Sequence, residues 1–204
     1  MPAAALFTRL HGAAFYKALH QQAAGMLPPA AAAQTWLDVG SGPGLLARMA
    51  GAKAYAVRAV DRDTRMIAAA KAWPGAWGEI SYAVSGLAEE VARGQRHDVV
   101  SASSLLVVLP DPREGLRLLA QLVKPGGRLL VIEASPQMSR IKAWAMLFSG
   151  RLGPGGALLA LWAMARAGRA LPDRLFTSWP GGQSRLPLLD GMANAWLLEV
   201  PGET

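Results

Sequence analysis

Residues 36–47 read Trp-Leu-Asp-Val-Gly-Ser-Gly-Pro-Gly-Leu-Leu-Ala, a short apolar run that stops at a glycine-rich loop. Gly40, Gly42 and Gly44 have no Cβ atoms, so the loop backbone can take positive φ angles and approach a ligand closely. The residues after the loop predict a helix, whose first N–H groups face a carboxylate or phosphate. This stretch therefore predicts a buried strand, a ligand-binding loop and a helix in succession.

An acidic residue nineteen positions past Gly42 makes the loop more informative. The run AYAVRAV at residues 54–60 predicts a second strand, and Asp61 follows it directly. An acid at this place can hydrogen-bond both ribose hydroxyls of a nucleoside. Loop and acid together predict a nucleoside-containing cofactor. Two simpler readings stay open, in which the glycines serve only a tight turn and Asp61 only caps the next helix.

Strands and helices alternate from this loop onward. Helices are predicted near 45–50, 64–73, 87–93 and 111–123, where Asp111 can cap, Pro112 suits the first position and Glu114 can reach back to the cap. The alternation predicts a parallel sheet covered on both faces. The strands are predicted at residues 34–39, 54–60, 80–84, 98–103 and 128–133.

The two ends of the chain differ from this alternating core. Residues 1–33 predict one helix, which Pro28-Pro29 ends, and the runs at 184–189 and 192–200 flank Asp190-Gly191, a strong hairpin signal. The predicted fold class is α/β: a single doubly wound, mostly parallel seven-stranded sheet with a C-terminal antiparallel hairpin. One domain is expected, made of an N-terminal helical cover (1–33), a cofactor-binding core (34–135), a helical substrate or lid insertion (136–182) and the hairpin (183–204).

Composition narrows the class of protein. Just over half of the 204 residues are hydrophobic and 17% are charged, which is typical of a globular chain. The lack of cysteine excludes disulfides, thiolate metal sites and a cysteine nucleophile, and it fits the cytoplasm, where we place the protein. The +7 net charge comes from scattered Arg and Lys residues, as on a solvated surface.

No segment predicts a signal peptide or a membrane span. Arg9, His11 and Lys17 interrupt the N-terminal apolar residues, and Arg151, Pro154 and four glycines interrupt the apolar stretch at 143–165. A soluble protein is expected, and peripheral contact with a membrane surface stays open.

The motifs together resemble the class I S-adenosylmethionine-dependent methyltransferases, especially the small-molecule branch with quinone and phospholipid methyltransferases. The resemblance covers about half of the chain, residues 34–135. It implies a Rossmann-like fold, S-adenosylmethionine as cofactor, S-adenosylhomocysteine as product, and methyl transfer to a small, apolar or amphipathic acceptor. It rests on LDVGSGPG (37–44), VDRDTRM (60–66), DVVSASSLLVVLPDP (98–112) and LVKPGGRLLVIE (122–133).

The resemblance also implies roles for individual residues. The glycine loop lines the methionine end of the cofactor while Asp38 steadies it, Asp61 holds the ribose, and the third strand leads to the adenine. The implied cofactor-binding residues are Asp38, Gly40, Ser41, Gly42 and Gly44 of the loop, Asp61, Arg62 and Met66 around the ribose and adenine, Gly86 and Leu87 after the third strand, and Ala102 and Ser103 near the sulfonium.

This sequence departs from the family pattern at two places. Leu87 stands where an acid usually meets the adenine amino group, so backbone groups of 86–88 or the Glu89 side chain would have to substitute. Val107 and Val108 stand where many relatives carry polar residues, which predicts an apolar substrate side.

Methyl transfer from a sulfonium needs orientation of the reactants and exclusion of water, and no metal. Consistently, we find no metal-spaced His pair. For a hydroxyl acceptor that must lose its proton, the candidates are His11 and Tyr16 on the N-terminal helix. Glu133, after the fifth strand, is expected to be a helix cap or a surface acid, and His97 to be structural.

The insertion suggests what the acceptor is like. Within residues 138–169, two apolar stripes are surrounded by cations, namely Arg140, Lys142, Arg151, Arg166 and Arg169. This pattern predicts a basic-edged lid over an apolar pocket that suits a lipid-like or aromatic acid, a membrane contact, or a cover for the sheet or a dimer. The stripes are Met138, Ile141, Ala145 and Phe148, and Leu158, Leu161, Trp162 and Ala165.

Three other functions remain as alternatives. A nicotinamide dehydrogenase would read Gly42-x-Gly44-x-x-Ala47 as its fingerprint, but this starts the motif two residues late. A nucleic-acid methyltransferase would suit the charge, but residues 101–104 (SASS) lack the motif of base-amino methylation, so a small-molecule partner is favoured over nucleic acid. A catalytically silent binding protein is the third, and the chain is expected to be a monomer or a homodimer.

Overall fold

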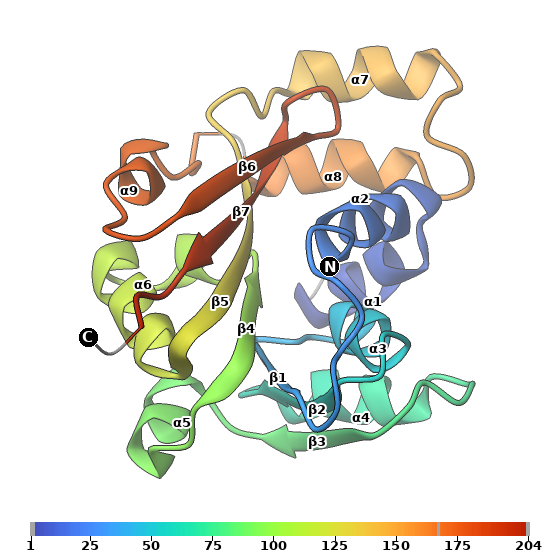
Figure 1. Cartoon of the computed structure of the whole chain (residues 1–204). Coiled ribbons are helices and arrows are strands. Elements are labelled where there is room, and N and C mark those ends of the chain that lie inside the picture. Colours follow the sequence, from blue (N-terminus) through green and yellow to red (C-terminus); the bar gives the residue numbers. More distant parts are fainter. Residues whose placement is uncertain (1–2, 167, 203–204) are drawn as a thin grey trace.

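The computed structural model describes residues 3–166 and 168–202, with side chains from residue 7 onward. Its centre is a seven-stranded sheet with the strand order β3-β2-β1-β4-β5-β7-β6 (Figure 1). Neighbouring strands among β1 to β5 pair in parallel, whereas β7 pairs antiparallel with β5 and β6. The predicted fold class is therefore confirmed. The strands are β1 (Thr35–Val39), β2 (Ala56–Asp61), β3 (Ile80–Val84), β4 (His97–Ser103), β5 (Val123–Ala134), β6 (Gln183–Leu188) and β7 (Ala193–Glu199).

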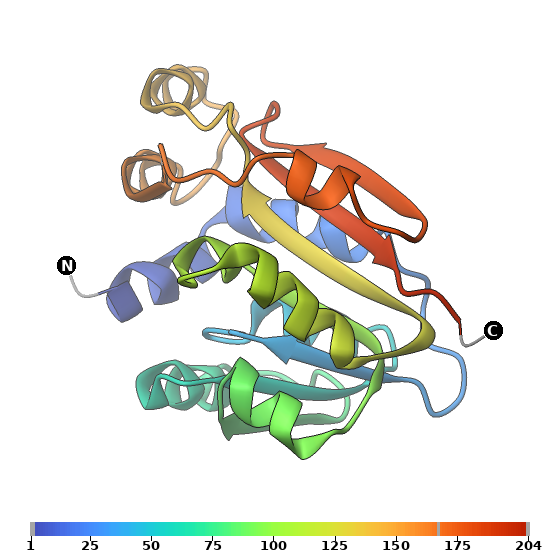
Figure 2. The same cartoon turned by 90° about the vertical axis from the view of Figure 1, so that its left-hand side faces the viewer.

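Helices cover both faces of this sheet, as the alternation of elements requires. In Figure 2, α5, α6 and α9 lie on the face turned toward the viewer, and α2 lies behind the sheet. Described helices are α1 (Ala3–Gly12), α2 (Ala14–Ala24), α3 (Leu45–Gly51), α4 (Thr64–Ala72), α5 (Leu87–Arg93), the 3-10 helix η1 (Leu106–Val108), α6 (Pro112–Gln121), α7 (Arg140–Phe148), α8 (Ala157–Arg166) and α9 (Arg174–Thr177). Of the described helices, none has the length and apolar character needed to cross a membrane.

The central strand β1 explains why the sheet is buried on both sides. Trp36 and Leu37 are both fully buried, although successive side chains of a strand point to opposite faces. Trp36 belongs to the apolar core beneath α2 and α3, where it meets Tyr55 edge to face with ring centroids 5.1 Å apart. Leu37 belongs to the core beneath α6. A strand that is apolar on both faces is thus the signature of a sheet between two helical layers.

The N-terminal helical cover differs from the prediction of one helix over residues 1–33. The chain bends at Ala13, whose backbone is extended (φ −73°, ψ 137°), so the segment forms α1 and α2, and α2 ends at Ala24, before Pro28. The Ala14 N–H donates to the Pro154 carbonyl instead of continuing the first helix. After this bend, α1 packs against α2 and α4, and α2 packs against α3.

The fifth strand also differs, because Lys124 to Gly127 were expected to separate helix and strand. Instead β5 begins at Val123, and the register of its pairing with β4 shifts between His97 and Val99. A Cβ at Gly127 would lie 2.7 Å from the Asp98 carbonyl oxygen, so glycine permits this close approach. The proline-glycine segment is thus an irregular part of the strand.

The predicted cap of α6 and the predicted hairpin both form, but each differs from its prediction in one detail. Asp111 caps α6 by accepting from the N–H groups of Arg113 and Glu114, as expected, but the Glu114 side chain pairs with Arg117 and does not reach back to the cap. The predicted hairpin is formed by β6 and β7. Its connection is longer than Asp190-Gly191 alone, because β6 ends at Leu188 and β7 begins at Ala193.

The two predicted apolar stripes do not form the buried face of the insertion. On α7, Ile141 and Phe148 are each 82% exposed, and Ala143 is the buried residue. The buried face of α8 comprises Leu159, Ala160, Trp162, Ala163 and Arg166, of which only Trp162 was predicted. Because this segment is so apolar, helical spacing fits more than one possible buried stripe. The packing of α7 and α8 buries a different set of residues from the predicted stripes.

Gly51 offers a test of the packing between α3 and the segment before β3. A Cβ at this position would clash with the Trp77 carbonyl oxygen, which is backbone and moves only with its loop. Gly51→Ala is expected to lower the free energy of unfolding by about 1–3 kcal/mol. Gly12, also the last residue of a helix, has no atom within 4 Å of its Cβ position, so Gly12→Ala should stay within about 0.5 kcal/mol. Urea denaturation compares the two, and equal effects would contradict this packing.

Candidate functional site

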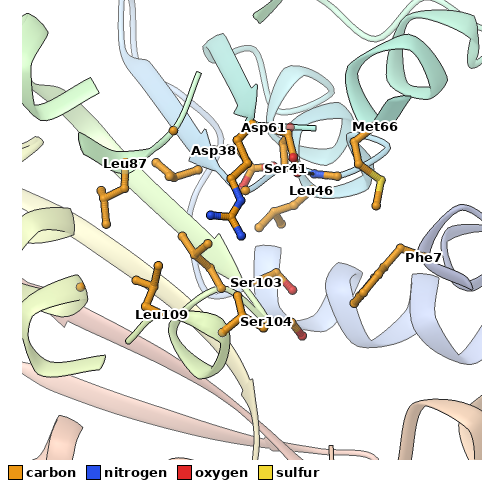
Figure 3. Close-up of a pocket in the computed structure, with 18 of the residues that line it drawn as sticks. Phe7, Asp38, Ser41, Leu46, Asp61, Met66, Leu87, Ser103, Ser104 and Leu109 are labelled. Carbon is orange, nitrogen blue, oxygen red and sulfur yellow. Dashed lines mark hydrogen bonds between the residues drawn. The ribbon is translucent and has the colours of Figure 1, made fainter. Parts of the chain in front are cut away.

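A pocket of about 700 Å³ opens at the carboxyl ends of the parallel strands. Strands β1 and β4 lie side by side there, and their connections lead to opposite faces of the sheet, which creates a crevice for ligands in sheets of this kind. Residues 38–42, 61, 62, 66, 85–89, 103–105 and 108–111 line it from the strand ends, and α1, α2 and α8 contribute side chains from above. Figure 3 shows Leu87 and Leu109 on one side of the pocket and Phe7 and Met66 on the other.

The glycine-rich loop forms one wall with three positive φ angles. These are 69° at Gly40, 53° at Gly42 and 76° at Gly44, conformations that side chains rarely adopt. A Cβ at Gly44 would lie 2.9 Å from the Tyr82 ring, whereas one at Gly42 would meet only the His11 ring, at 3.7 Å. Gly42 therefore faces the pocket, and Gly44 packs tightly against Tyr82 outside its lining.

Asp61 ties this loop to the end of β2. Its carboxylate accepts from the Gly42 N–H and from the Asp63 N–H, each at 2.9 Å. The residue that caps α4 is Asp63, which accepts from the Arg65 N–H. Asp61 is therefore not the helix cap, and its carboxylate lines the pocket beside Gly42, where it can also accept from a ligand hydroxyl.

Asp38 lies at the floor of the pocket and is 2% exposed. Its Oδ1 accepts the Ser101 hydroxyl at 2.6 Å, and Trp36 Nε1 donates to the same hydroxyl oxygen at 2.8 Å. Its Oδ2 has no partner among the described residues. Burial, with a smaller contribution from the Asp61 charge, raises the pKa of Asp38 to about 7. An unpartnered carboxylate oxygen at this place is available to a ligand donor.

The N-terminal helices bring a cluster of polar rings to the end of β4. His20 Nε2 lies 2.9 Å from the Ser103 hydroxyl oxygen, its Nδ1 lies 2.9 Å from the Tyr16 carbonyl, and the Tyr16 side chain also hydrogen-bonds Ser103. The ring centroids of Tyr16 and His20 are 4.4 Å apart, and those of His11 and Tyr16 are 5.4 Å apart. The His11 Nδ1 has no partner among the described residues.

Burial sets the protonation of these rings. It raises the pKa of Tyr16 to about 12, lowers that of His20 to about 4, and holds the pKa of His11 well below its usual range. At neutral pH, both histidines are therefore uncharged and can accept a proton, whereas Tyr16 keeps its proton and can donate it in a hydrogen bond.

Glu133 corrects the expectation of a surface acid or ordinary cap. It is 3% exposed, and its Oε1 accepts from the Leu106 N–H at 2.8 Å, so it holds the first turn of η1. Burial raises the pKa of Glu133 to about 7. His97 is buried, as expected for a structural residue.

The third-strand side of the pocket has Leu87 where an acid was expected, and Glu89 is the acid nearest to it in the sequence that lines the pocket. Leu87 lines this side together with Gly86, Ala88 and Glu89. The Glu89 Oε2 accepts from the Gly86 N–H at 3.1 Å, and this interaction fastens the start of α5. Beyond them, Leu105, Val108 and Leu109 make the next wall apolar, whereas Val107 does not line the pocket.

The structure brings most of the predicted site residues into this one pocket. Gly44 and Ala102 are outside its lining: the Ala102 side chain enters the core beneath α6, because alternate residues of β4 point to opposite faces. The predicted residues that line the pocket are His11, Tyr16, Asp38, Gly40, Ser41, Gly42, Asp61, Arg62, Met66, Gly86, Leu87 and Ser103.

Sequence reasoning missed two lining residues on the helices, His20 and Phe7. His20 follows Tyr16 by four positions, and this spacing places both on one face of α2. Arg166, one of the cations predicted at the edge of the pocket, lines it and is buried. No local pattern marks Phe7 or the burial of Arg166, since these depend on how α1 and α8 pack over the strand ends.

Comparison with known proteins assigns this architecture to a family. The model of a family described as "Methyltransferase domain" matches residues 9–179, which include every pocket residue just named except Phe7. The chain belongs to the methyltransferase domain family.

Individual relatives of this methyltransferase domain are distant. A ubiquinone biosynthesis O-methyltransferase of Salmonella newport (strain SL254) is 33% identical over 116 residues, 56% of this chain and 47% of that protein. The chain thus spans about half the length of the curated relatives it matches.

Two solved structures share the fold. An O-methyltransferase family protein of Burkholderia thailandensis has a TM-score of 0.64 at 16% identity and covers 90% of this chain and 56% of its own. The plantazolicin methyltransferase BpumL, solved with S-adenosylhomocysteine, has a TM-score of 0.60 at 13% identity and covers 96% and 85%.

The buried Asp38 predicts a pH-dependent stability. A raised pKa means that folding favours the protonated acid, so this stabilisation is present at acidic pH and is lost as pH rises through about 7. Asp38→Asn, which resembles the protonated form, should gain about 1 kcal/mol or more relative to the unmodified protein between pH 5 and pH 8. Urea unfolding at both pH values measures this difference.

A matched variant controls for the loss of an acid. Asp98 is partly exposed, and the Lys124 ammonium and Thr35 donors hold its pKa below its usual value, so it is ionised at both pH values. Asp98→Asn should therefore cost the same at pH 5 and pH 8. A pH-independent difference for Asp38→Asn would show that Asp38 is ionised throughout.

Proposed function

We propose that this methyltransferase domain transfers a methyl group from S-adenosylmethionine to a small, apolar or amphipathic acceptor and releases S-adenosylhomocysteine. The observation that carries the proposal is that one pocket joins a glycine loop braced by Asp61 to an apolar wall of Leu105, Val108 and Leu109. The glycine loop with Asp61 suits a nucleoside cofactor, and the apolar wall suits an apolar acceptor. We also propose that the protein acts in the cytoplasm as one domain with the four segments given above.

The cofactor fits the donors and acceptors of the pocket. Asp61 would accept from the ribose hydroxyls, and Arg62 and Met66 would border the adenine beside Gly86 and Leu87. Gly42 leaves space for the methionine part, and the unpartnered Oδ2 of Asp38 would accept from a donor at that end. Because Leu87 stands in place of the expected acid, backbone groups of residues 86–88 or the Glu89 side chain would hydrogen-bond the adenine edge.

S-adenosylmethionine supplies a methyl group already activated by the positive sulfur, so the chain needs mainly to orient the acceptor and exclude water. The acceptor lone pair forms the new bond to carbon, and the electrons of the broken bond remain on sulfur. If the acceptor is a hydroxyl or an amine, one proton must also leave. We propose His11 as the group that accepts it, while Tyr16, with its pKa of about 12, stays protonated and donates a hydrogen bond.

Asp61 provides the sharpest test of cofactor binding. Asp61→Ala removes the acceptor for the ribose and the brace on Gly42, so S-adenosylhomocysteine should bind about 1.5–3 kcal/mol more weakly by calorimetry. Asp63→Ala, two residues away, removes the α4 cap and no pocket acceptor, and should keep the affinity. Equal affinities of both variants and the unmodified protein would contradict the placement.

Turnover tests the reaction itself. The protein is incubated with radiolabelled S-adenosylmethionine and extracts of small molecules and lipids, and labelled products are separated. Incorporation that Asp61→Ala abolishes supports the proposal. Binding of S-adenosylhomocysteine without any incorporation would favour a silent binding protein. Incorporation into nucleic acid would favour a nucleic-acid methyltransferase.

A second surface supports contact with an anionic membrane. Between Glu133 and Asp173 the chain has five Arg and Lys residues and no acid. Within this segment α7 exposes Ile141, Phe148 and about half of Trp144, beside the exposed cations Arg140 and Lys142. Figure 1 shows α7 stacked on α8 beyond the sheet. An amphipathic helix with cationic neighbours is suited to lie on an anionic bilayer, and we propose that α7 does so.

Removing the exposed apolar groups tests this contact. Ile141→Ser with Phe148→Ser should reduce cosedimentation with vesicles of phosphatidylcholine and phosphatidylglycerol at least tenfold, because apolar area is lost from the contact. Val84→Ser, which alters a half-exposed apolar residue on β3, is the control and should bind normally. Equal binding to pure phosphatidylcholine, or a double variant that only dissociates a dimer, would assign the face another role.

A further inference from the structure

Arg166 is the buried cation of the pocket. It ends α8 and is only 7% exposed, yet it lines the pocket. Its guanidinium carbon lies 5.7 Å from the centroid of the Phe7 ring, and its Nε has no hydrogen-bond partner among the described residues. Arginine is almost never buried without a partner, because removing its charge from water is costly. An unpartnered guanidinium nitrogen in a pocket therefore points to an anionic ligand.

The groups around Arg166 leave much of its charge unbalanced. The electrostatic neighbours are Glu133, Tyr16 and Arg169. Tyr16 is protonated at neutral pH, and burial raises the pKa of Glu133 to about 7, so that acid is only partly ionised there. Arg169 adds a further positive charge. A ligand carboxylate would supply the missing charge and a planar pair of acceptors, which suits a guanidinium.

The position of Arg166 separates it from the nucleoside-binding features. The loop at Gly42 and the carboxylate of Asp61 lie at the ends of β1 and β2. Tyr16 and Glu133, which interact electrostatically with Arg166, belong to the other half of the sheet. Tyr16 hydrogen-bonds Ser103 at the end of β4, and Glu133 lies near the end of β5. A nucleoside held at β1 and β2 leaves this half to the acceptor and to the sulfonium end of the cofactor, which is expected near Ser103.

We infer that Arg166, with the Tyr16 hydroxyl beside it, binds an acidic group of the acceptor, so that the substrate is an apolar or aromatic carboxylic acid. This rests on the proposed methyl transfer and names the class of its substrate. The apolar side chains of Phe7, Leu105 and Leu109 would hold the body of such a molecule, and the buried cation would fix its orientation. Charge-assisted hydrogen bonds away from water are strong and directional.

The test compares an acid with a neutral molecule of the same size. Benzoate and benzyl alcohol are titrated into the protein loaded with S-adenosylhomocysteine. The unmodified protein should bind benzoate at least tenfold more tightly, and Arg166→Met, which keeps the length and the apolar contact with Phe7, should abolish the preference. Arg169→Gln removes a nearby exposed cation and should retain it. S-adenosylhomocysteine should bind all three proteins alike.

Three results would overturn the inference. One is equal binding of benzoate and benzyl alcohol to the unmodified protein. Another is an unchanged preference in Arg166→Met. The third is weaker binding of S-adenosylhomocysteine to Arg166→Met with unchanged binding of 5′-methylthioadenosine, which lacks the amino-acid part, because Arg166 would then hold the carboxylate of the cofactor. If the unmodified protein fails to bind S-adenosylhomocysteine at all, the proposed function itself is wrong.

A second measurement keeps the test valid if Arg166→Met does not fold. The Nε–H resonance of Arg166 in the unmodified protein should shift when benzoate is added and should not shift with benzyl alcohol. Arg166→Lys, which preserves a positive charge without the planar pair of donors, serves to assign that resonance. A resonance that responds equally to both molecules would contradict the inference.

Discussion

The hydrogen bond from the Gly42 N–H to the Asp61 carboxylate is the interaction on which the pocket depends. It joins the loop after β1 to the end of β2, and the Ser41 N–H reinforces it by donating to the Val60 carbonyl at 2.9 Å. The loop can reach these acceptors only because its glycines adopt positive φ angles. Loop, acid and strand ends therefore form one rigid wall, and the ligand-facing groups are held in place before any ligand binds, which lowers the entropic cost of binding.

Several of the buried polar groups that lack a partner belong to residues that line this pocket. Asp38 Oδ2, His11 Nδ1 and Arg166 Nε are buried without partners among the described residues, although buried polar groups are normally paired. They come from β1, α1 and α8, so several layers of the molecule converge on one cavity. Such conflicts between stability and local structure are expected at functional sites, where a ligand completes the missing interactions.

The helical insertion divides its apolar residues between the sheet and the surface. Trp162 on α8 is buried and packs edge to face against Tyr16, with ring centroids 5.7 Å apart, which couples the insertion to the polar cluster. On α7, in contrast, Trp144 and Phe148 stack on each other at 5.9 Å and remain exposed. One segment thus reaches both the pocket and the outer surface, so an acceptor that partitions into membranes would be close to the site that uses it.

The sequence by itself determined the α/β class, the order of strands and helices along the chain, and the loop at Gly40–Gly44 with Asp61. Local patterns of apolar residues, glycines and acids are sufficient to predict these features. The sequence did not determine the bend at Ala13, the exposed face of α7 or the burial of Glu133 and Arg166. Those depend on which surfaces meet when distant segments pack, and an apolar helix with several possible stripes does not reveal which one faces the core. Tertiary structure alone brought Arg166 from α8 and Tyr16 from α2 to the lining of one pocket, although they are 150 positions apart in the sequence.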